Sequence, residues 1–325
     1  MSPRVKRLAP EVIAGQAAAP HTGALQTHTE IDMLSRINLA TALDAPAASA
    51  ATPLPTRFLD TEGGRLAYDD TGGAGPVVVC VPGMGDLRGE YRALRPALVA
   101  AGWRVLTLDV RGFGDSSASW SELSARAVGR DVVRLIEHLR SGPAIVLGNS
   151  FAAGAALWAA RQAPQGVDGV VLLGPIVRDA PPNPLMRAVL RLGFAGPWRL
   201  AFWMAYWNSL FPLRRPPDHA EAREALRRNL REPGRMDALR TMVGLSKADT
   251  EAMLPDSRVP ALVVMGTRDP DFADATAEAR WLAQGIGAEL MLVEGAGHYP
   301  HLECPGQVAP RVLDFLRERL AARAR

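Results

Sequence analysis

The 325-residue sequence has few cysteines, no long apolar run and no concentration of charge of either sign. Its two cysteines, Cys80 and Cys304, form neither a CxxC motif nor a ligand cluster, which argues against a zinc site and a disulfide framework. No stretch is long and apolar enough to span a bilayer, so we expect no stable membrane insertion. The net charge is only +3 with the arginines spread along the chain, which argues against nucleic-acid binding.

The N-terminus also lacks the apolar segment of a signal peptide, because Glu11, Gln16 and several prolines interrupt it. We therefore expect a cytoplasmic protein. Residues 1–55 are rich in Ala, Pro and Thr with little periodicity, which predicts a flexible N-terminal extension. The whole chain is 48% hydrophobic and 22% charged, ordinary values for a protein with a substantial core.

Short apolar runs recur along the rest of the chain. Continuous Val, Ile and Leu runs are typical of strands that are covered on both faces of a mainly parallel sheet. The predicted strands are Arg57–Asp60, Arg65–Asp70, Val77–Val81, Arg104–Val110, Ala144–Leu147, Val170–Leu173, Leu262–Met265 and Glu289–Val293. The predicted helices between and after them are Leu87–Ala101, Glu122–Arg140, Phe151–Gln162 and Val308–Ala322. This alternation predicts a doubly wound α/β domain of about eight strands, formed by residues 56–175 and 255–325.

Residues 176–254 break the alternation, because they contain no convincing strand. Gly196-Pro197 and Pro212 are reasonable start and stop signals for a helix, and a second helix is predicted over Asp218–Leu230. We therefore predict an inserted helical cap. Its aromatic side chains recur at three- and four-residue spacing, and most of them are expected to pack within the cap. Four are predicted to line an apolar substrate pocket, namely Trp198, Phe202, Trp203 and Tyr206.

A segment of small residues, Gly148–Gly154, follows one predicted buried strand and begins a predicted helix. A serine at such a sharp turn exposes its hydroxyl, and the turn needs small neighbours, which Gly148, Ala152 and Gly154 supply. The helix N-terminus behind the serine favours developing negative charge. We interpret Ser150 as a nucleophile; a serine that only caps an ordinary helix is the alternative.

A serine nucleophile needs a base, and the sequence has six histidines. Two lie in the extension, one in a predicted surface helix and one in the predicted cap. His298 follows the last predicted strand, at the edge of the sheet where Ser150 is expected, and the loop glycines before it let the ring reach inward. We predict His298 as the base. His301 is the alternative, with the expected role of supporting the loop.

The base needs a carboxylate that fixes its tautomer and stabilises the imidazolium. Asp269 is the first carboxylate after the predicted strand Leu262–Met265, and Asp271 and Asp274 are the alternatives. We predict Asp269, which gives the chain order Ser, Asp, His.

A loop after an early strand, Val81–Asp86, is expected to supply part of an oxyanion hole. Gly83 and Gly85 permit close backbone approach, so the predicted donors are the N–H groups of Met84 and Phe151. A plain glycine-rich turn is the alternative.

Two further segments carry a resemblance to a known family. Asp109–Ser116 resembles a D-x-R-G-x-G-x-S segment, and Gly297–Glu303 resembles a G-H-x-P-H-x-E segment. From about Arg57 onward the chain resembles the α/β-hydrolase superfamily, in its capped esterase, haloperoxidase-like and epoxide-hydrolase-like branch. Within the first segment, Asp109, Arg111 and Asp115 are expected to brace the loop by Arg–Asp pairing rather than to carry chemistry.

The sequence departs from the family pattern at two positions. Pro82 stands where the family often has a His before the Gly, but a backbone donor does not need that side chain. Ala152 replaces the second Gly of G-x-S-x-G and is still small. In this family, relatives that hydrolyse epoxides or carbon–halogen bonds use an Asp nucleophile, so Ser150 argues against both reactions.

The expected function is therefore that of a serine hydrolase, which cleaves a carboxylic ester or related acyl bond of a small, moderately hydrophobic substrate through an acyl-enzyme. No metal and no organic cofactor are expected. Acyl transfer, perhydrolysis and carbon–carbon bond hydrolysis use the same triad and stay open, as do a non-catalytic small-molecule sensor and a lipid-surface protein. The sequence leaves the oligomeric state open.

Overall fold

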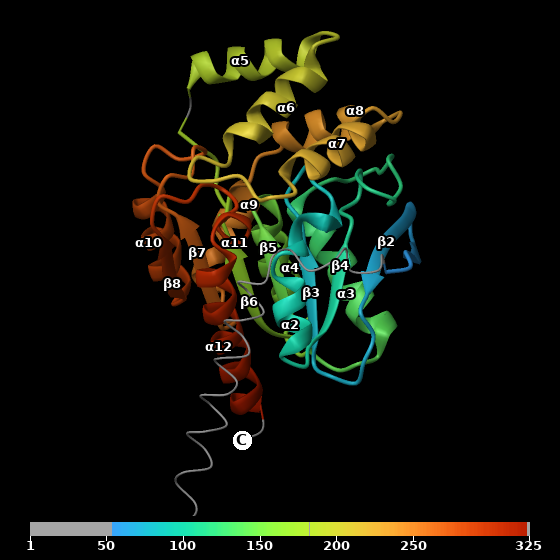
Figure 1. Ribbon diagram of the computed structural model, residues 1–325, viewed down its shortest axis with the longest axis vertical. Helices are drawn as coiled ribbons and strands as arrows, with labels where there is room; N and C mark the ends of the chain where they lie inside the picture. The colour runs from blue at the N-terminus through green and yellow to red at the C-terminus, as the bar shows by residue number, and fades with distance from the viewer. Residues whose placement is uncertain (1–53, 182, 324–325) are drawn as a thin grey trace, which may run out of the picture. The chain divides into compact units, whose positions relative to one another are not determined.

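A computed structural model of the chain describes residues 54–181 and 183–323 (Figure 1). The predicted extension, residues 1–55, lies almost wholly outside these residues. Eight strands form one sheet in the order β1-β2-β4-β3-β5-β6-β7-β8. The strands are β1 (Arg57–Thr61), β2 (Gly64–Asp70), β3 (Val77–Val81), β4 (Arg104–Leu108), β5 (Ala144–Asn149), β6 (Val167–Leu173), β7 (Ala261–Gly266) and β8 (Glu289–Val293).

The sheet is antiparallel at one edge and parallel over the rest. β1 pairs with β2, and β2 with β4, in antiparallel fashion, whereas all pairs from β4 across to β8 are parallel. Every residue of β3, β5 and β7 is buried, as continuous apolar strands covered on both faces require. This confirms the predicted α/β sheet of about eight strands.

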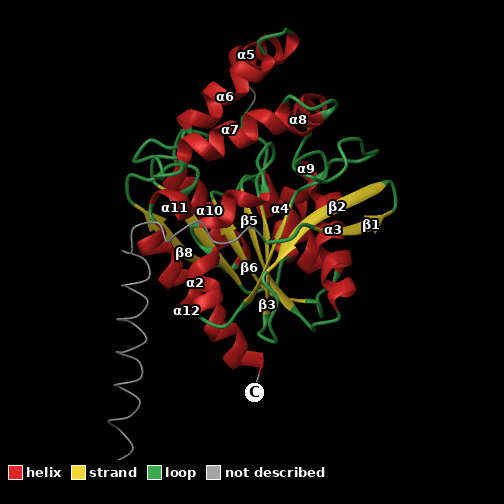
Figure 2. Ribbon diagram, turned by 45° about the vertical axis from the view of Figure 1, so that its right-hand side comes forward, coloured by secondary structure: helices red, strands yellow, loops and turns green. Residues whose placement is uncertain are grey.

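Helices cover both faces of the sheet (Figure 2). α3 packs closely on α4, and α2 contacts α12. These core helices are η1 (Arg88–Arg92), α2 (Arg95–Ala100), α3 (Ala125–Leu139), α4 (Phe151–Gln162), α10 (Ala275–Ile286), α11 (Pro300–Glu303) and α12 (Pro305–Arg323).

The continuous helix expected over Leu87–Ala101 is wrong. The structure divides it into the 3-10 helix η1 and the short helix α2. The physical reason is Pro96, which lies in the first turn of α2. A proline has no backbone N–H and its ring excludes the preceding turn of an α-helix, so a new helix begins beside it.

In the described residues, five α-helices and the 3-10 helix η2 (Leu254–Asp256) lie between β6 and β7, where the sequence predicts an insertion. The α-helices are α5 (Pro184–Ala195), α6 (Arg199–Ser209), α7 (His219–Leu230), α8 (Arg235–Gly244) and α9 (Ala248–Met253). Figure 1 shows α5 to α8 together at the top, beyond one end of the strands. In the described part of the chain, no helix is long and apolar enough to cross a bilayer.

The loop after β4 is held by arginine–aspartate pairs at two places. Arg111 donates two hydrogen bonds to Asp131 on α3, at 2.7 and 2.6 Å, and a third to the backbone oxygen of Glu122. Arg88 pairs with both Asp109 and Asp115. The Arg111–Asp131 pair is buried, so each charge depends on the other for compensation. These pairs fix a loop that also meets the inserted helices, since Gly114 exchanges hydrogen bonds with the side chain of Asn229 on α7.

We therefore expect the Asp131→Ala substitution to lower the free energy of unfolding by about 3–5 kcal/mol, because it leaves Arg111 buried without its counter-charge. Urea denaturation measures the change. The matched control is Glu224→Ala, which removes an exposed pair with Arg227 and should change stability by less than about 1 kcal/mol. Equal, small effects of the two substitutions would contradict the bracing role.

Candidate active site

Ser150 occupies a sharp turn between β5 and α4. Its φ is +57° and its ψ is −126°, a conformation that residues with a side chain rarely adopt. Its backbone N–H donates to the backbone oxygen of Leu173 in β6. Its backbone oxygen accepts from the N–H groups of Ile176 and Ala153. The strained backbone is therefore held by three hydrogen bonds, and strain of this kind persists only where the surroundings impose it.

The turn requires a missing side chain at one position. A Cβ atom at Gly148 would lie 2.2 Å from the oxygen of Ala152, so no other residue fits there without moving the turn. The Cβ atom of Ala152 is fully buried and accommodated. The alanine that departs from the family pattern is therefore compatible with the turn.

The predicted oxyanion loop lies directly against Ser150. A Cβ atom at Gly83 would lie 3.1 Å from the Cβ atom of Ser150. Met84 follows Gly83, and among the described residues its N–H donates no hydrogen bond. Phe151 is the first residue of α4, where an N–H has no acceptor within the helix. Both predicted donors are thus backbone N–H groups beside the serine.

His298 lies in the loop between β8 and α11 and is 2% exposed. Its backbone oxygen accepts a hydrogen bond from the side-chain amide of Asn149, the residue before Ser150, at 3.2 Å. Its backbone N–H donates to the oxygen of Leu210, which follows α6. The histidine is therefore fixed on one side by the serine turn and on the other by the inserted helices.

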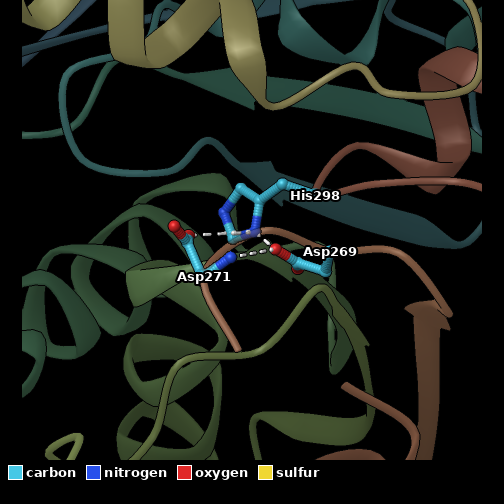
Figure 3. A group of neighbouring side chains, drawn as sticks. All are labelled: Asp269, Asp271 and His298. Carbon is cyan, nitrogen blue, oxygen red and sulfur yellow. Dashed lines mark hydrogen bonds and ion pairs between the residues drawn. The ribbon is translucent and has the colours of Figure 1, made fainter. Parts of the chain in front are cut away.

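Two carboxylates from the loop after β7 face the imidazole (Figure 3). Asp269 Oδ2 lies 2.7 Å from His298 Nδ1, and Asp271 Oδ2 lies 3.3 Å from the same nitrogen. Asp269 is also held by the N–H of Asp271, which donates to Asp269 Oδ1 at 3.0 Å. The shorter contact and the buried position favour Asp269, the predicted residue, as the partner that fixes the tautomer. Asp274 instead caps α10, where it accepts from Ala277.

The charges around the imidazole determine its basicity. Burial lowers the pKa of His298, but the nearby Asp269 and Asp271 carboxylates outweigh this effect and raise the pKa to about 9. Burial raises the pKa of Asp271, although the nearby His298 opposes the shift. The imidazole therefore has a strong tendency to hold a proton.

No hydrogen bond among the described residues joins the Ser150 hydroxyl to the His298 ring. Such a bond commonly forms with its productive length only once substrate is bound. The structure nevertheless brings both residues to the same edge of the sheet, linked through Asn149.

The four aromatic residues predicted to line a pocket separate into two pairs. Trp203 contacts the oxyanion loop, because a Cβ atom at Gly85 would lie 2.8 Å from its ring. The hydroxyl of Tyr206 donates to Asp271 at 2.5 Å. By contrast, Phe202 packs on α5, and Trp198 is 54% exposed with its indole N–H bonded to the oxygen of Leu192. The structure therefore brings Trp203 and Tyr206 to the site, but not Trp198 or Phe202.

Three buried acidic residues near the site were missed from the sequence. Asp86 accepts from the Trp207 indole at 3.1 Å and from the Tyr299 hydroxyl at 2.8 Å, which connects α6 to the histidine loop. Glu303 accepts from the backbone N–H of Leu213, and Glu90 from that of Gly83. Glu303 belongs to the recognised G-H-x-P-H-x-E segment, which was a usable signal for it. Nothing in the sequence around Asp86 or Glu90 distinguishes them from surface carboxylates.

In the described part of the chain, one cluster of side chains has ligand atoms close enough to share a metal ion, and it is Asp269, Asp271 and His298. Its ligand atoms lie within 4.8 Å of one another. Two of these ligand atoms, Asp269 Oδ2 and His298 Nδ1, already pair with each other. The cluster is thus accounted for by the pairing of a histidine with carboxylates.

Comparison with known proteins gives relatives of several kinds. The polyketide synthase ThaQ of Burkholderia thailandensis is 29% identical over 276 residues, which are 83% of this chain but only 13% of the synthase. The dihydrolipoyllysine-residue acetyltransferase component of the acetoin cleaving system of Pseudomonas putida is 28% identical, over 89% of this chain and 77% of that protein. The named relatives thus differ in activity and in length, and they do not select one reaction for this chain.

The solved structure of a thermophilic esterase from Thermogutta terrifontis is similar, with a TM-score of 0.64 and 24% identity, over 82% of this chain and 99% of the esterase. This likeness shows the fold. The sequence model of the family described as alpha/beta hydrolase fold matches residues 76–305, more than two thirds of the chain. The chain therefore belongs to the α/β-hydrolase family, which confirms the hydrolase fold and family predicted from its sequence.

Proposed function

We propose that this protein is a serine hydrolase that cleaves a carboxylic ester, or a related acyl bond, of a small and moderately hydrophobic substrate. One observation carries the proposal. A serine with a positive φ immediately precedes the first residue of α4, at the same sheet edge as a buried histidine whose Nδ1 atom lies 2.7 Å from a carboxylate. This combination supports nucleophilic attack by a hydroxyl group. The serine also supports acyl chemistry over the epoxide and carbon–halogen reactions that relatives perform with an aspartate.

In the proposed reaction, the hydroxyl of Ser150 attacks the carbonyl carbon while Nε2 of His298 takes its proton. The N–H groups of Met84 and Phe151 stabilise the negative charge on the carbonyl oxygen. His298 then delivers the proton to the leaving alkoxide, and an acyl-enzyme remains. A water molecule that His298 deprotonates attacks the acyl group and frees Ser150. Asp269 holds the imidazole in the tautomer that leaves Nε2 unprotonated and stabilises the imidazolium.

We also propose that residues 176–254 act as a cap that limits the size and polarity of the substrate. The contacts of Trp203 with Gly85 and of Tyr206 with Asp271 support this role, because both place cap side chains beside proposed reacting groups.

A cytoplasmic location is proposed as well. Cys80 and Cys304 are both buried and free, which is compatible with a reducing compartment.

The first test is turnover of p-nitrophenyl esters of short and medium chain length by the wild type and by Ser150→Ala. We expect the substitution to lower kcat by at least about 10⁴-fold, because the nucleophile is lost while the fold is retained. The dependence on chain length measures the size of the acyl site. A fluorophosphonate probe should label the wild type and leave the variant unlabelled.

Circular dichroism of the variant is the control for folding. The proposal fails if wild-type protein turns over none of these esters and its Ser150 is not labelled. Equal turnover by both proteins would show that the activity does not pass through Ser150.

A second test concerns pH. Because His298 must be neutral to accept a proton and its pKa is raised to about 9, we expect kcat/KM to increase with pH up to about 9 and then to level off. The Asp271→Asn substitution removes one of the carboxylates that raise this pKa, so the acidic limb of the profile should move to lower pH. Rates are corrected for spontaneous hydrolysis. Glu224→Gln is the control, since Glu224 is exposed, and its profile should match the wild type.

A further inference from the structure

Glu90 and His301 lie buried behind the oxyanion loop, and the proposed reaction uses neither of them. The side chains of both residues are fully buried. Glu90 lies in η1, and its neighbour Tyr91 donates from its hydroxyl to the oxygens of Val81 and Leu147, at 2.9 and 3.2 Å. Tyr91 thus fixes η1 to the ends of β3 and β5, the two strands that precede the oxyanion loop and Ser150.

The two carboxyl oxygens of Glu90 have different partners. Oε2 accepts a hydrogen bond from the N–H of Gly83 at 3.0 Å. Oε1 lies 3.2 Å from Nε2 of His301. The imidazole of His301 is stacked on the ring of Tyr91, with centroids 5.4 Å apart. The histidine therefore has a fixed position from which it faces the carboxyl group.

The surroundings favour the uncharged form of each member of this pair. Burial raises the pKa of Glu90 well above its usual range, and the Asp86 carboxylate adds to this effect. Burial lowers the pKa of His301 to about 3. Two other titratable groups affect both residues. Arg92 on η1 and His298 on the histidine loop each lower the pKa of Glu90 and of His301. A carboxylic acid and a neutral imidazole facing each other leave Oε2 free as a neutral acceptor.

The charge of the acceptor matters here because Gly83, which Glu90 holds, lies close to the proposed nucleophile and oxyanion donor. Gly83 passes so close to Ser150 that a Cβ atom on it would lie 3.1 Å from the serine Cβ atom, and it precedes Met84, the proposed oxyanion donor. A carboxylate charge behind that donor would raise the energy of the negative charge that develops on the substrate oxygen. A neutral acceptor orients the Gly83 peptide without this penalty.

We propose that Glu90 and His301 are positioning residues: together they hold the Gly83–Met84 turn against Ser150 in the orientation that presents the Met84 N–H to the oxyanion. This inference rests on the proposed serine hydrolase function. It assigns a role to a buried carboxyl group that has no part in the triad.

Two substitutions at Glu90 separate its possible roles. Glu90→Gln keeps an acceptor for Gly83 and a donor toward His301, without any charge. Glu90→Leu has a similar size and removes the acceptor. We expect kcat of Glu90→Gln to stay within about threefold of the wild type, and that of Glu90→Leu to fall about 10- to 100-fold, the range for a misplaced oxyanion donor. KM should change much less than kcat in either variant, because the oriented N–H stabilises the charge of the transition state more than the neutral carbonyl of the bound substrate.

A trifluoromethyl ketone provides a matched inhibitor, since it forms a tetrahedral oxyanion on the serine. Its affinity for Glu90→Leu should fall by about the same factor as kcat/KM. A residue that only stabilises the fold would not produce this parallel loss at constant KM. His301→Phe keeps the stacking on Tyr91 but removes the nitrogen that faces Glu90, and it should lower kcat at unchanged KM. This variant replaces Glu90→Leu if the latter does not fold.

Amide hydrogen exchange of residues 83–86, and of the Gly83 N–H above all, tests the same inference without any turnover. Exchange at the turn should be faster in Glu90→Leu by about tenfold or more and unchanged in Glu90→Gln. The inference is overturned if Glu90→Leu leaves both exchange and kcat within twofold of the wild type. It is also overturned if Glu90→Gln is as impaired as Glu90→Leu, because a charge would then be required. If the wild type has no esterase activity, the proposed function fails, and the exchange measurement still decides whether Glu90 holds the turn.

Discussion

The backbone of Ser150 has a φ of +57°, and hydrogen bonds to Leu173, Ile176 and Ala153 hold it there. Such a conformation costs about 1–3 kcal/mol, which the burial of β5, β6 and α4 around it offsets. The close approach of Gly148 to Ala152 makes the turn possible. The position of every other group in the site is set relative to this turn, from the oxyanion loop to the histidine that Asn149 holds.

A second theme is the use of buried carboxyl groups as hydrogen-bond acceptors between loops. Asp86 joins Trp207 of α6 to Tyr299, and Glu303 joins the chain after α6 to the histidine loop. Glu90 does the same for the oxyanion loop. Since a buried acceptor without a donor is costly, each of these residues specifies which loops must meet. The site is thus assembled from loops whose positions depend on one another.

The sequence predicted the sheet well because continuous Val, Ile and Leu runs occur only where both faces are covered. Ser150 and His298 followed from their places after strands, since parallel strands end at the same edge. Asp269 was predicted over Asp271 because it is the first carboxylate after its strand, but only the structure shows that both carboxylates face the imidazole. The orientation of Trp198 and Phe202 toward α5 depends on packing between helices, which spacing alone does not determine. Glu90 was missed because the sequence does not show whether a glutamate is buried or exposed to solvent.

The hydrogen bond from the backbone N–H of His298 to the oxygen of Leu210 means that the inserted helices form part of the support of the histidine itself. The proposed cap and the proposed base are therefore joined through one backbone hydrogen bond. A recombinant protein that received the insertion of a relative, in order to accept a different substrate, would inherit a histidine loop without its acceptor unless the new insertion placed an equivalent carbonyl where Leu210 stands. Exchange of this insertion between relatives is consequently constrained at the segment that follows α6, in the interior of the insertion, more than at its aromatic lining.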